Sequence, residues 1–279
     1  MIEEKGAVMA ETPLTDSQFW DVFWEDIKLP DLINQQVQWQ RALTQAFQRH
    51  LPLGQGCTLF EIGCAPGRWL AWFNKVMGYT VAGCDFSPQG IKLTQWNLQM
   101  NRVEGQVFQA DILTDPLPED RYDVVISLGL IEHFEHPEQV IARHVALLKP
   151  GGLLVLEVPN MAGWLNRRLL LMAGLDDLLA VHNLTVMNRR FLRSVADTFG
   201  LKTRYLGYIG GFDPGLILYN YNYGTGSRSQ LLARIWRRKH VIILLLWLFE
   251  RVLRRVPQFA GRINAAAYSH MLLGVFQAP

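Results

Sequence analysis

Short apolar runs alternate with longer amphipathic stretches over most of the chain, from about residue 57 onward. Five of these runs have the length and composition of buried strands, at residues 57–62, 80–84, 106–110, 122–127 and 152–158. Strands that alternate with helices of about ten or more residues predict parallel β-α-β units with right-handed crossovers. The expected fold class is therefore α/β, with an open, doubly wound sheet whose ligand lies beyond the carboxyl ends of the strands.

The pattern becomes less regular after the fifth predicted strand. It predicts an apolar helix within residues 160–183 and an amphipathic helix at residues 188–199. Two further strands are expected at residues 201–209 and 268–276, which brings the sheet to seven strands. Residues 211–264, between those last two strands, are expected to form a long, partly helical insertion.

Before the β-α pattern begins, residues 1–50 carry two apolar stripes at helical spacing, so this segment is expected to be helical and to precede a main domain at residues 51–279. The members of the stripes are Phe19, Trp20, Phe23 and Trp24 in the first, and Val37, Trp39, Leu43 and Phe47 in the second. Packing in a core is the simplest interpretation of both stripes.

Composition and charge narrow the class of protein. The 279 residues are 49% hydrophobic and 19% charged, which fits one large domain with a sizeable core. A formal net charge of +2 is too small to indicate a nucleic-acid partner. The three cysteines lack metal-ligand spacing and indicate buried thiols in a reducing compartment. Because acidic residues stand at the N-terminus where a signal peptide needs basic ones, a cytoplasmic location is expected.

The first predicted strand leads into a glycine-rich turn, Glu61-Ile-Gly-Cys-Ala-Pro-Gly67. A dinucleotide-binding turn needs a third glycine five positions after the first, and Arg68 stands there, so an NAD-dependent oxidoreductase does not fit. Glu61 would be misplaced beside a pyrophosphate but suits a ligand that carries a sulfonium and an ammonium group. Gly63 and Gly67 would let the backbone approach such a ligand closely.

This turn resembles motif I of the class I S-adenosylmethionine-dependent methyltransferases, in which glycine is commoner at the position of Ala65. Further segments are similar to that family's motifs in order and spacing. They are Asp85 at the end of the second strand, Asp111-Ile112 after the third, residues 122–134 around the fourth, and the turn at residues 147–152.

The resemblance implies a Rossmann-like sheet, mostly parallel with a final antiparallel strand, that binds S-adenosyl-L-methionine and releases S-adenosyl-L-homocysteine. It implies that Asp85 accepts from the ribose hydroxyls, that Asp111 accepts from the adenine amine, and that Ile112 packs on the ring. It also places the aromatic N-terminal helix where related enzymes carry a lid over the cofactor. The implied cofactor-binding residues are Glu61, Gly63, Cys64, Ala65, Gly67, Asp85, Phe86, Asp111, Ile112, Ser127 and Leu128.

Two histidines are candidates for the chemistry. His133 follows the fourth strand, where the methyl group should project, and is either a general base or a residue that only orders its loop. His182 lies in the segment at residues 160–186, which roofs the acceptor pocket in this family, and is a candidate acceptor contact. The cluster Glu132, His133, Glu135 and His136 could be interpreted as metal ligands. Four polar residues at a loop-helix junction are more typical of solvated or capping positions, so no metal is expected.

The insertion has an unusual charge pattern. Eight Lys and Arg side chains between residues 228 and 255 stand against the single Glu250, and they flank the apolar run at residues 241–249. That run is far shorter than the roughly 20 residues that span a bilayer. Residues 228–256 are therefore expected either to make peripheral contact with an anionic membrane or to pack on the sheet or on a second copy of the chain, as a homodimer.

Together these features predict a methyltransferase that acts on a small or lipid-linked, hydrophobic acceptor. Such acceptors include a quinone or isoprenoid precursor, a natural product and a glycan. Nucleic acid is not expected, because the positive charge surrounds an apolar run and is not interleaved with stacking aromatic residues. The alternative from another class is a non-catalytic partner subunit that binds S-adenosylmethionine. The intact motif residues indicate binding of the cofactor, but they do not indicate turnover.

Overall fold

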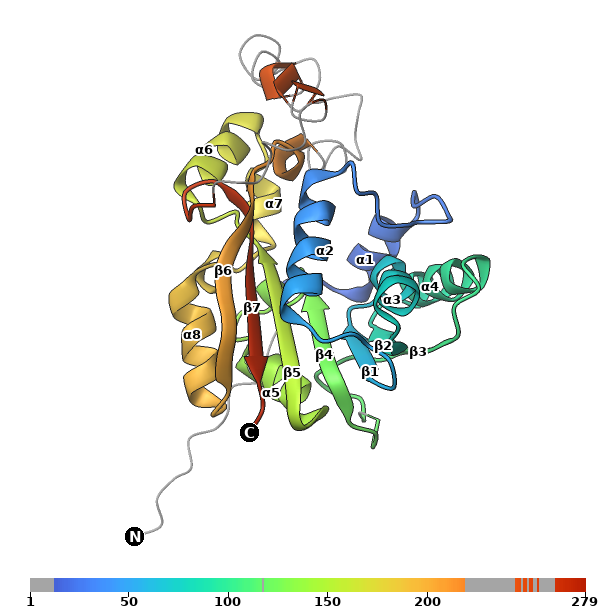
Figure 1. The fold of residues 1–279 in the computed structure, drawn as a ribbon. Coiled ribbons are helices and arrows are strands. Elements are labelled where there is room, and N and C mark those ends of the chain that lie inside the picture. The colour runs from blue at the N-terminus through green and yellow to red at the C-terminus, as the bar shows by residue number, and fades with distance from the viewer. Residues whose placement is uncertain are drawn as a thin grey trace.

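A seven-stranded sheet forms the centre of the molecule in the computed structural model (Figure 1). The structure describes residues 13–116, 118–218, 244–246, 248–249, 251–252, 255 and 264–279. The strands are β1 (Thr58–Ile62), β2 (Thr80–Asp85), β3 (Gly105–Gln109), β4 (Tyr122–Leu128), β5 (Leu148–Pro159), β6 (Lys202–Phe212) and β7 (Ser269–Gln277).

The strand order is β3-β2-β1-β4-β5-β7-β6. Strands β1 to β5 pair in parallel, and β7 runs antiparallel to both of its neighbours, β5 and β6. The α/β, doubly wound fold with a final antiparallel strand is thus confirmed. Because the chain order reverses between β1 and β4, the carboxyl ends of these two strands mark the switch point at which ligands bind in such sheets.

Each face of the sheet is covered by its own hydrophobic core. Successive residues of β1 point to opposite faces, so Phe60 packs in one core and Leu59 in the other. The helices around the sheet are α1 (Ser17–Trp24), α2 (Gln38–His50), α3 (Arg68–Trp72), α4 (Pro88–Met100), α5 (Glu138–Ala146), α6 (Trp164–Ala173), α7 (Asp176–Ala180) and α8 (Arg189–Thr198). Shorter helical turns are η1 (Phe73–Met77), η2 (Ile131–His133) and η3 (Leu184–Val186).

The apolar helix expected within residues 160–183 is two helices, α6 and α7. Gly174 ends α6 in the left-handed conformation, with φ of 75°, and its backbone N–H donates to Leu170 and Leu171. A left-handed glycine that satisfies the last carbonyls is a common helix terminator. The chain therefore turns at Gly174, and the roof segment reaches His182 by a bent path.

The two N-terminal helices differ in burial. Helix α2 buries Leu43 and Phe47 in the core, as its stripe predicts. Helix α1 has no buried residue. It is fixed to the start of α4 by Asp21, whose carboxylate accepts from Ser87 Oγ at 2.5 Å and from the Gln89 backbone N–H at 3.2 Å. The core-packing interpretation thus holds for α2 and fails for α1.

The predicted insertion begins later than residue 211, because β6 continues to Phe212. Most of the basic segment at residues 228–256 lies outside the described residues. Among the residues that are described, no helix is long and apolar enough to cross a bilayer.

Candidate functional site

A cavity of about 340 Å³ lies at the carboxyl ends of the central parallel strands and is bordered by α1. One side, here called the carboxylate side, follows β1, β2 and β3 and carries Glu61, Asp85 and Asp111. The other, here called the imidazole side, follows β4 and carries Glu132, His133 and, from the roof segment, His182. The sheet topology thus brings residues of both sides into one cavity.

The glycine-rich turn at the carboxylate side is shaped by its backbone. The N–H groups of Gly63 and Cys64 both donate to the Cys84 carbonyl, at 2.8 and 3.0 Å. Gly67 has φ of 86°, and a Cβ added there would lie 2.9 Å from Cγ2 of Thr94. A larger residue at Gly67 would be strained and would also clash, so the glycine is needed for the fold of the turn.

Glu61 and Asp85 form a pair of buried carboxylates beside this turn. Glu61 is 2% exposed, and its Oε2 has no hydrogen-bond partner among the described residues. Burial first, and then the charge of Asp85, raise the pKa of Glu61 well above its usual value. Asp85 accepts from the backbone N–H groups of Ala65 and Ser87, at 3.0 and 2.9 Å, yet burial raises its pKa to about 6. Two buried carboxyl groups at a cavity wall are suited to a cationic ligand, because a nearby cation stabilises their charged forms.

All but three of the predicted cofactor residues line the cavity, and of these only Leu128, on β4, lies outside the carboxylate side. Those that line the cavity are Glu61, Gly63, Ala65, Asp85, Phe86, Asp111, Ile112 and Leu128. Cys64 packs in the core, Gly67 lies against Thr94 of α4, and Ser127 is 1% exposed within β4. These three residues do not line the cavity.

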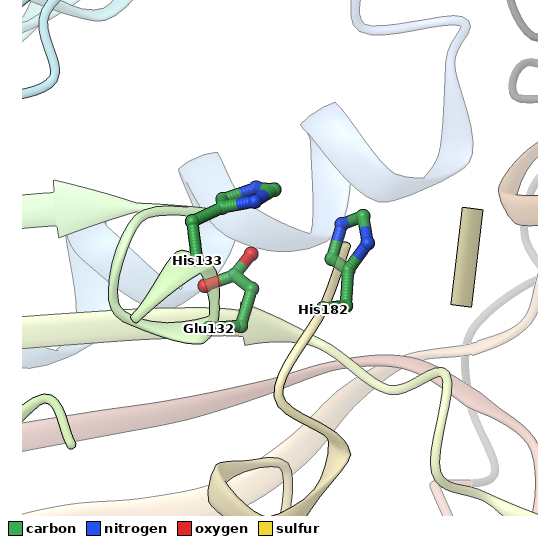
Figure 2. Close-up of side chains that lie close together, drawn as sticks. All are labelled: Glu132, His133 and His182. Atoms are coloured by element: carbon green, nitrogen blue, oxygen red, sulfur yellow. The ribbon is translucent and has the colours of Figure 1, made fainter. Parts of the chain in front are cut away.

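The imidazole side joins two segments that are about 50 residues apart in the chain, as Figure 2 shows. Asn183 ties them together: its backbone N–H donates to the Glu132 carbonyl at 2.6 Å, and its Nδ2 donates to the Phe134 carbonyl at 3.0 Å. The rings of His133 and His182 lie with their centroids 4.5 Å apart. The other predicted polar neighbours, Glu135 and His136, are exposed.

Both histidines are oriented by the backbone. His133 Nδ1 lies 3.1 Å from the Val181 carbonyl, and His182 Nδ1 lies 2.7 Å from the Leu178 carbonyl. A carbonyl only accepts, so each Nδ1 carries the proton and each Nε2 carries a lone pair. Burial lowers the pKa of His133 to about 3 and also lowers that of His182. Both rings are therefore neutral near pH 7, and His133 on its own is a weak base.

Two residues that line the cavity, Glu157 and His270, lie outside the sequence motifs. Glu157, near the end of β5, is buried, and burial raises its pKa to about 8. The position of Glu157 at the carboxyl end of a central strand is a signal that could have found it. His270 Nδ1 on β7 lies 3.5 Å from Asp213 Oδ2, and the pairing of β7 with β6 brings these two side chains together.

The geometry agrees with the comparisons with known proteins. A family model described as a methyltransferase domain matches residues 32–206, which is more than half of the chain. The chain belongs to the class I S-adenosylmethionine-dependent methyltransferases. S-adenosylmethionine is the cofactor of this family, and the unpartnered carboxylate oxygen of Glu61 fits its cationic end.

Curated relatives of this methyltransferase are similar over part of their length. The methyltransferase GfsG of Streptomyces halstedii is 24% identical over 48% of this chain and 48% of its own. A ubiquinone biosynthesis O-methyltransferase of Rhodopseudomonas palustris is 25% identical over 55% of this chain and 61% of its own. The chain therefore spans about half the length of the curated relatives it matches.

Solved structures share the fold at low sequence identity. Geranyl diphosphate C-methyltransferase from Streptomyces coelicolor superposes with a TM-score of 0.53 and 15% identity, over 85% of this chain and 80% of its own. The [4+2]-cyclase SpnF superposes with a TM-score of 0.58 and 13% identity, over 97% of each chain. Because a cyclase has this fold too, the reaction has to be argued from the site.

Proposed function

We propose that this methyltransferase transfers the methyl group of S-adenosylmethionine to a small, apolar or lipid-linked acceptor. The observation that carries the proposal is the continuity of the cavity, which reaches from the buried carboxylates Glu61 and Asp85 to the side chains of His133 and His182. A cofactor held on the carboxylate side would thus share one continuous cavity with an acceptor on the imidazole side.

The chain's own residues divide the work of holding the cofactor. Asp85 would accept from the ribose hydroxyls, and Asp111 with Ile112 would hold the adenine. Glu61, with its unpartnered oxygen, would face the cationic end. When bound, the cofactor supplies a methyl group that its sulfonium has already activated. The protein's further task is to position the acceptor in line with it.

The acceptor class follows from the wall on the imidazole side. Apolar side chains from α1, the roof segment and the start of the insertion line it: Phe19, Trp20, Met161, Leu178 and Leu216. A wall of this kind favours an apolar acceptor with few polar groups. The names of some relatives are consistent with this class, because one set acts in ubiquinone biosynthesis and a structural neighbour methylates geranyl diphosphate.

The test is formation of S-adenosylhomocysteine by the purified full chain with panels of acceptors. We expect product with prenylated phenols or isoprenoid alcohols and none with transfer RNA, against boiled enzyme as the control. Binding of the cofactor without turnover on any acceptor would favour the non-catalytic partner subunit. Turnover on RNA alone would overturn the acceptor class.

Membrane contact through residues 228–256 stays a prediction and has its own test. Flotation with anionic liposomes is expected for the full chain and not for a chain that lacks residues 228–256. Equal flotation of the two chains would contradict it, and a dimer that forms only with the segment present would support packing on a second copy.

A further inference from the structure

We propose that Glu132, His133 and His182 form a binding site for one divalent transition-metal ion, with Zn²⁺ as the reference ion. This departs from the expectation, from the sequence, that no metal is present. One ligand atom from each of the three side chains lies within 4.8 Å of the other two. Figure 2 shows the Glu132 carboxylate below the His133 ring, with the His182 ring to one side of both.

The distances are close to those of a bound site. Zinc takes histidine nitrogen and carboxylate oxygen at about 2.0–2.2 Å in tetrahedral geometry, so two ligand atoms of one ion are about 3.4 Å apart. Movements of the side-chain ends by up to about 1.5 Å, which rotation about their side-chain bonds allows, would close the set from its present spacing. Two histidines and one carboxylate are also a common ligand set for ions that keep positions open for substrate.

The hydrogen bonds around the cluster are those of metal ligands. A ligating histidine usually donates its other ring N–H to a carbonyl or carboxylate, which fixes the tautomer and the ring. His133 and His182 both do so, through Nδ1, to the Val181 and Leu178 carbonyls. Each Nε2 lone pair is thus directed away from the backbone. The site is held in advance of any ion.

The charge balance also favours a cation. Glu132 is 1% exposed, and its Oε2 has no hydrogen-bond partner among the described residues. Glu157, which lines the same cavity and is 6% exposed, adds a second buried acidic group. A dication would offset both carboxylates, whereas a buried carboxylate without a partner is costly.

The backbone joins the ligand segments from both sides. Asn183, next to His182, donates to the Glu132 carbonyl at 2.6 Å. On the other side, the Leu14 backbone N–H donates to the His133 carbonyl at 2.7 Å, and the Trp20 ring packs edge-on against His133 at 4.9 Å. Three chain segments thus converge on one point of the cavity wall.

The ion would take an oxygen of the acceptor as a further ligand. The proposed apolar acceptor would therefore carry an oxygen-bearing group such as a hydroxyl. An ion of this kind lowers the pKa of a bound hydroxyl and so replaces a strong base. The hydroxyl proton leaves to water, the oxygen lone pair bonds to the methyl carbon, and the carbon–sulfur bond breaks with its electrons remaining on sulfur. This role rests on the proposed methyl transfer, whereas binding of the ion does not.

The experiment begins with the full chain after removal of metal by a chelator. Calorimetry with Zn²⁺ is expected to show one tightly bound ion per chain. Co²⁺ in its place should give proton NMR with two strongly shifted, exchangeable resonances, one from each Nδ1–H. If no Zn²⁺ ion binds tightly, or if the Co²⁺ spectrum lacks these resonances, the proposed site is overturned even if no variant can be made.

Variants locate the site. His182→Ala and Glu132→Gln are expected to weaken Zn²⁺ binding on the order of 100-fold, since even loss of an outer hydrogen bond typically costs about 10–100-fold. His136→Ala and Glu135→Gln, in the same loop but exposed, are the matched controls and should not change it. If the His182→Ala and Glu132→Gln proteins still bind Zn²⁺ and the His136→Ala and Glu135→Gln proteins do not, the ion binds at the surface and the proposal is overturned.

S-adenosylhomocysteine binding separates this proposal from the proposed function. The variants are expected to retain it, which also shows that they fold, and His182→Gln takes the place of any His182→Ala protein that does not. A wild-type chain that binds the nucleoside but does not bind Zn²⁺ would refute the metal site alone. A wild-type chain that binds Zn²⁺ but does not bind the nucleoside would refute the proposed function alone.

Discussion

The two sides of the cavity are built differently. The carboxylate side comes from one continuous stretch, residues 61–112, in which each functional residue follows a parallel strand or lies at its end. The imidazole side is assembled from the η2 turn and the roof segment, and the N-terminal segment braces it. Asn183 and Leu14 hold it by hydrogen bonds to the carbonyls of Glu132 and His133.

This difference indicates a division of roles. Side chains at strand ends are fixed by the sheet ladder, which suits recognition of an invariant cofactor. Side chains on connecting segments can change without disturbing the sheet, which suits recognition of an acceptor. The comparison predicts that substitutions on one side leave the ligand of the other side largely unaffected.

The largest effect is expected for Asp85→Asn. A hydrogen bond to a charged group contributes about 1.5–3 kcal/mol, and the ribose hydroxyls would make two to Asp85, so S-adenosylhomocysteine affinity should fall by about 100-fold or more. Calorimetry is the measurement. Asp123→Asn is the matched control, because Asp123 caps Thr58 at the opposite end of the strands, with 2.8 Å to the Thr58 N–H.

His182→Ala completes this comparison and should leave S-adenosylhomocysteine affinity within about twofold. A loss as large as that of Asp85→Asn would mean that the two sides form one binding site. Wild-type affinity in the Asp85→Asn protein would remove the carboxylate side from cofactor binding.

A smaller effect is expected from pH. Burial raises the pKa of Asp85 to about 6 in the free protein, and the ribose hydroxyls bind its charged form. Below pH 6 the carboxyl group must lose a proton on binding, so affinity should fall as the pH falls, by about tenfold from pH 7 to pH 5. Calorimetry in two buffers of different ionisation enthalpy would detect the released proton. In Asp85→Asn the slope should flatten, and an equally steep slope there would assign the proton to another group such as Glu61.

Most of the fold could be predicted from the sequence because its signals are local. The start of helix α4 is an example, since Ser87 caps it and Pro88 suits its first position. The buried strands are continuous apolar runs between turn signals. The division of the roof segment into α6 and α7 at Gly174 could not be predicted, because an isolated glycine in an apolar pattern does not reveal whether its φ is positive.

How well the site residues could be predicted from the sequence differs between the two sides of the cavity. The carboxylate side could be predicted, because strand, turn and helix follow one another within a few residues. The Asp213–His270 pair could not, because its members are joined only by the antiparallel pairing of β7 with β6. Nor could the sequence separate α1 from α2, whose stripes look alike. The contact of Asp21 with Ser87, which places α1 beside the cavity, is tertiary.

The smallest effect is expected on the rate at which the nucleoside dissociates, if α1 acts as a lid over both sides of the cavity. Trp24 is half-buried, lines the cavity, and lies 4.8 Å from Phe23 and 6.2 Å from Trp20 between ring centroids. Trp24→Ala should open a path to solvent, so S-adenosylhomocysteine should dissociate about fivefold faster with little change in its association rate. Stopped-flow fluorescence measures both rates. Trp96→Ala, which removes a 54% exposed tryptophan of α4 away from the cavity, is the matched control. If the two variants release the nucleoside at the same rate, α1 covers the cavity without gating it.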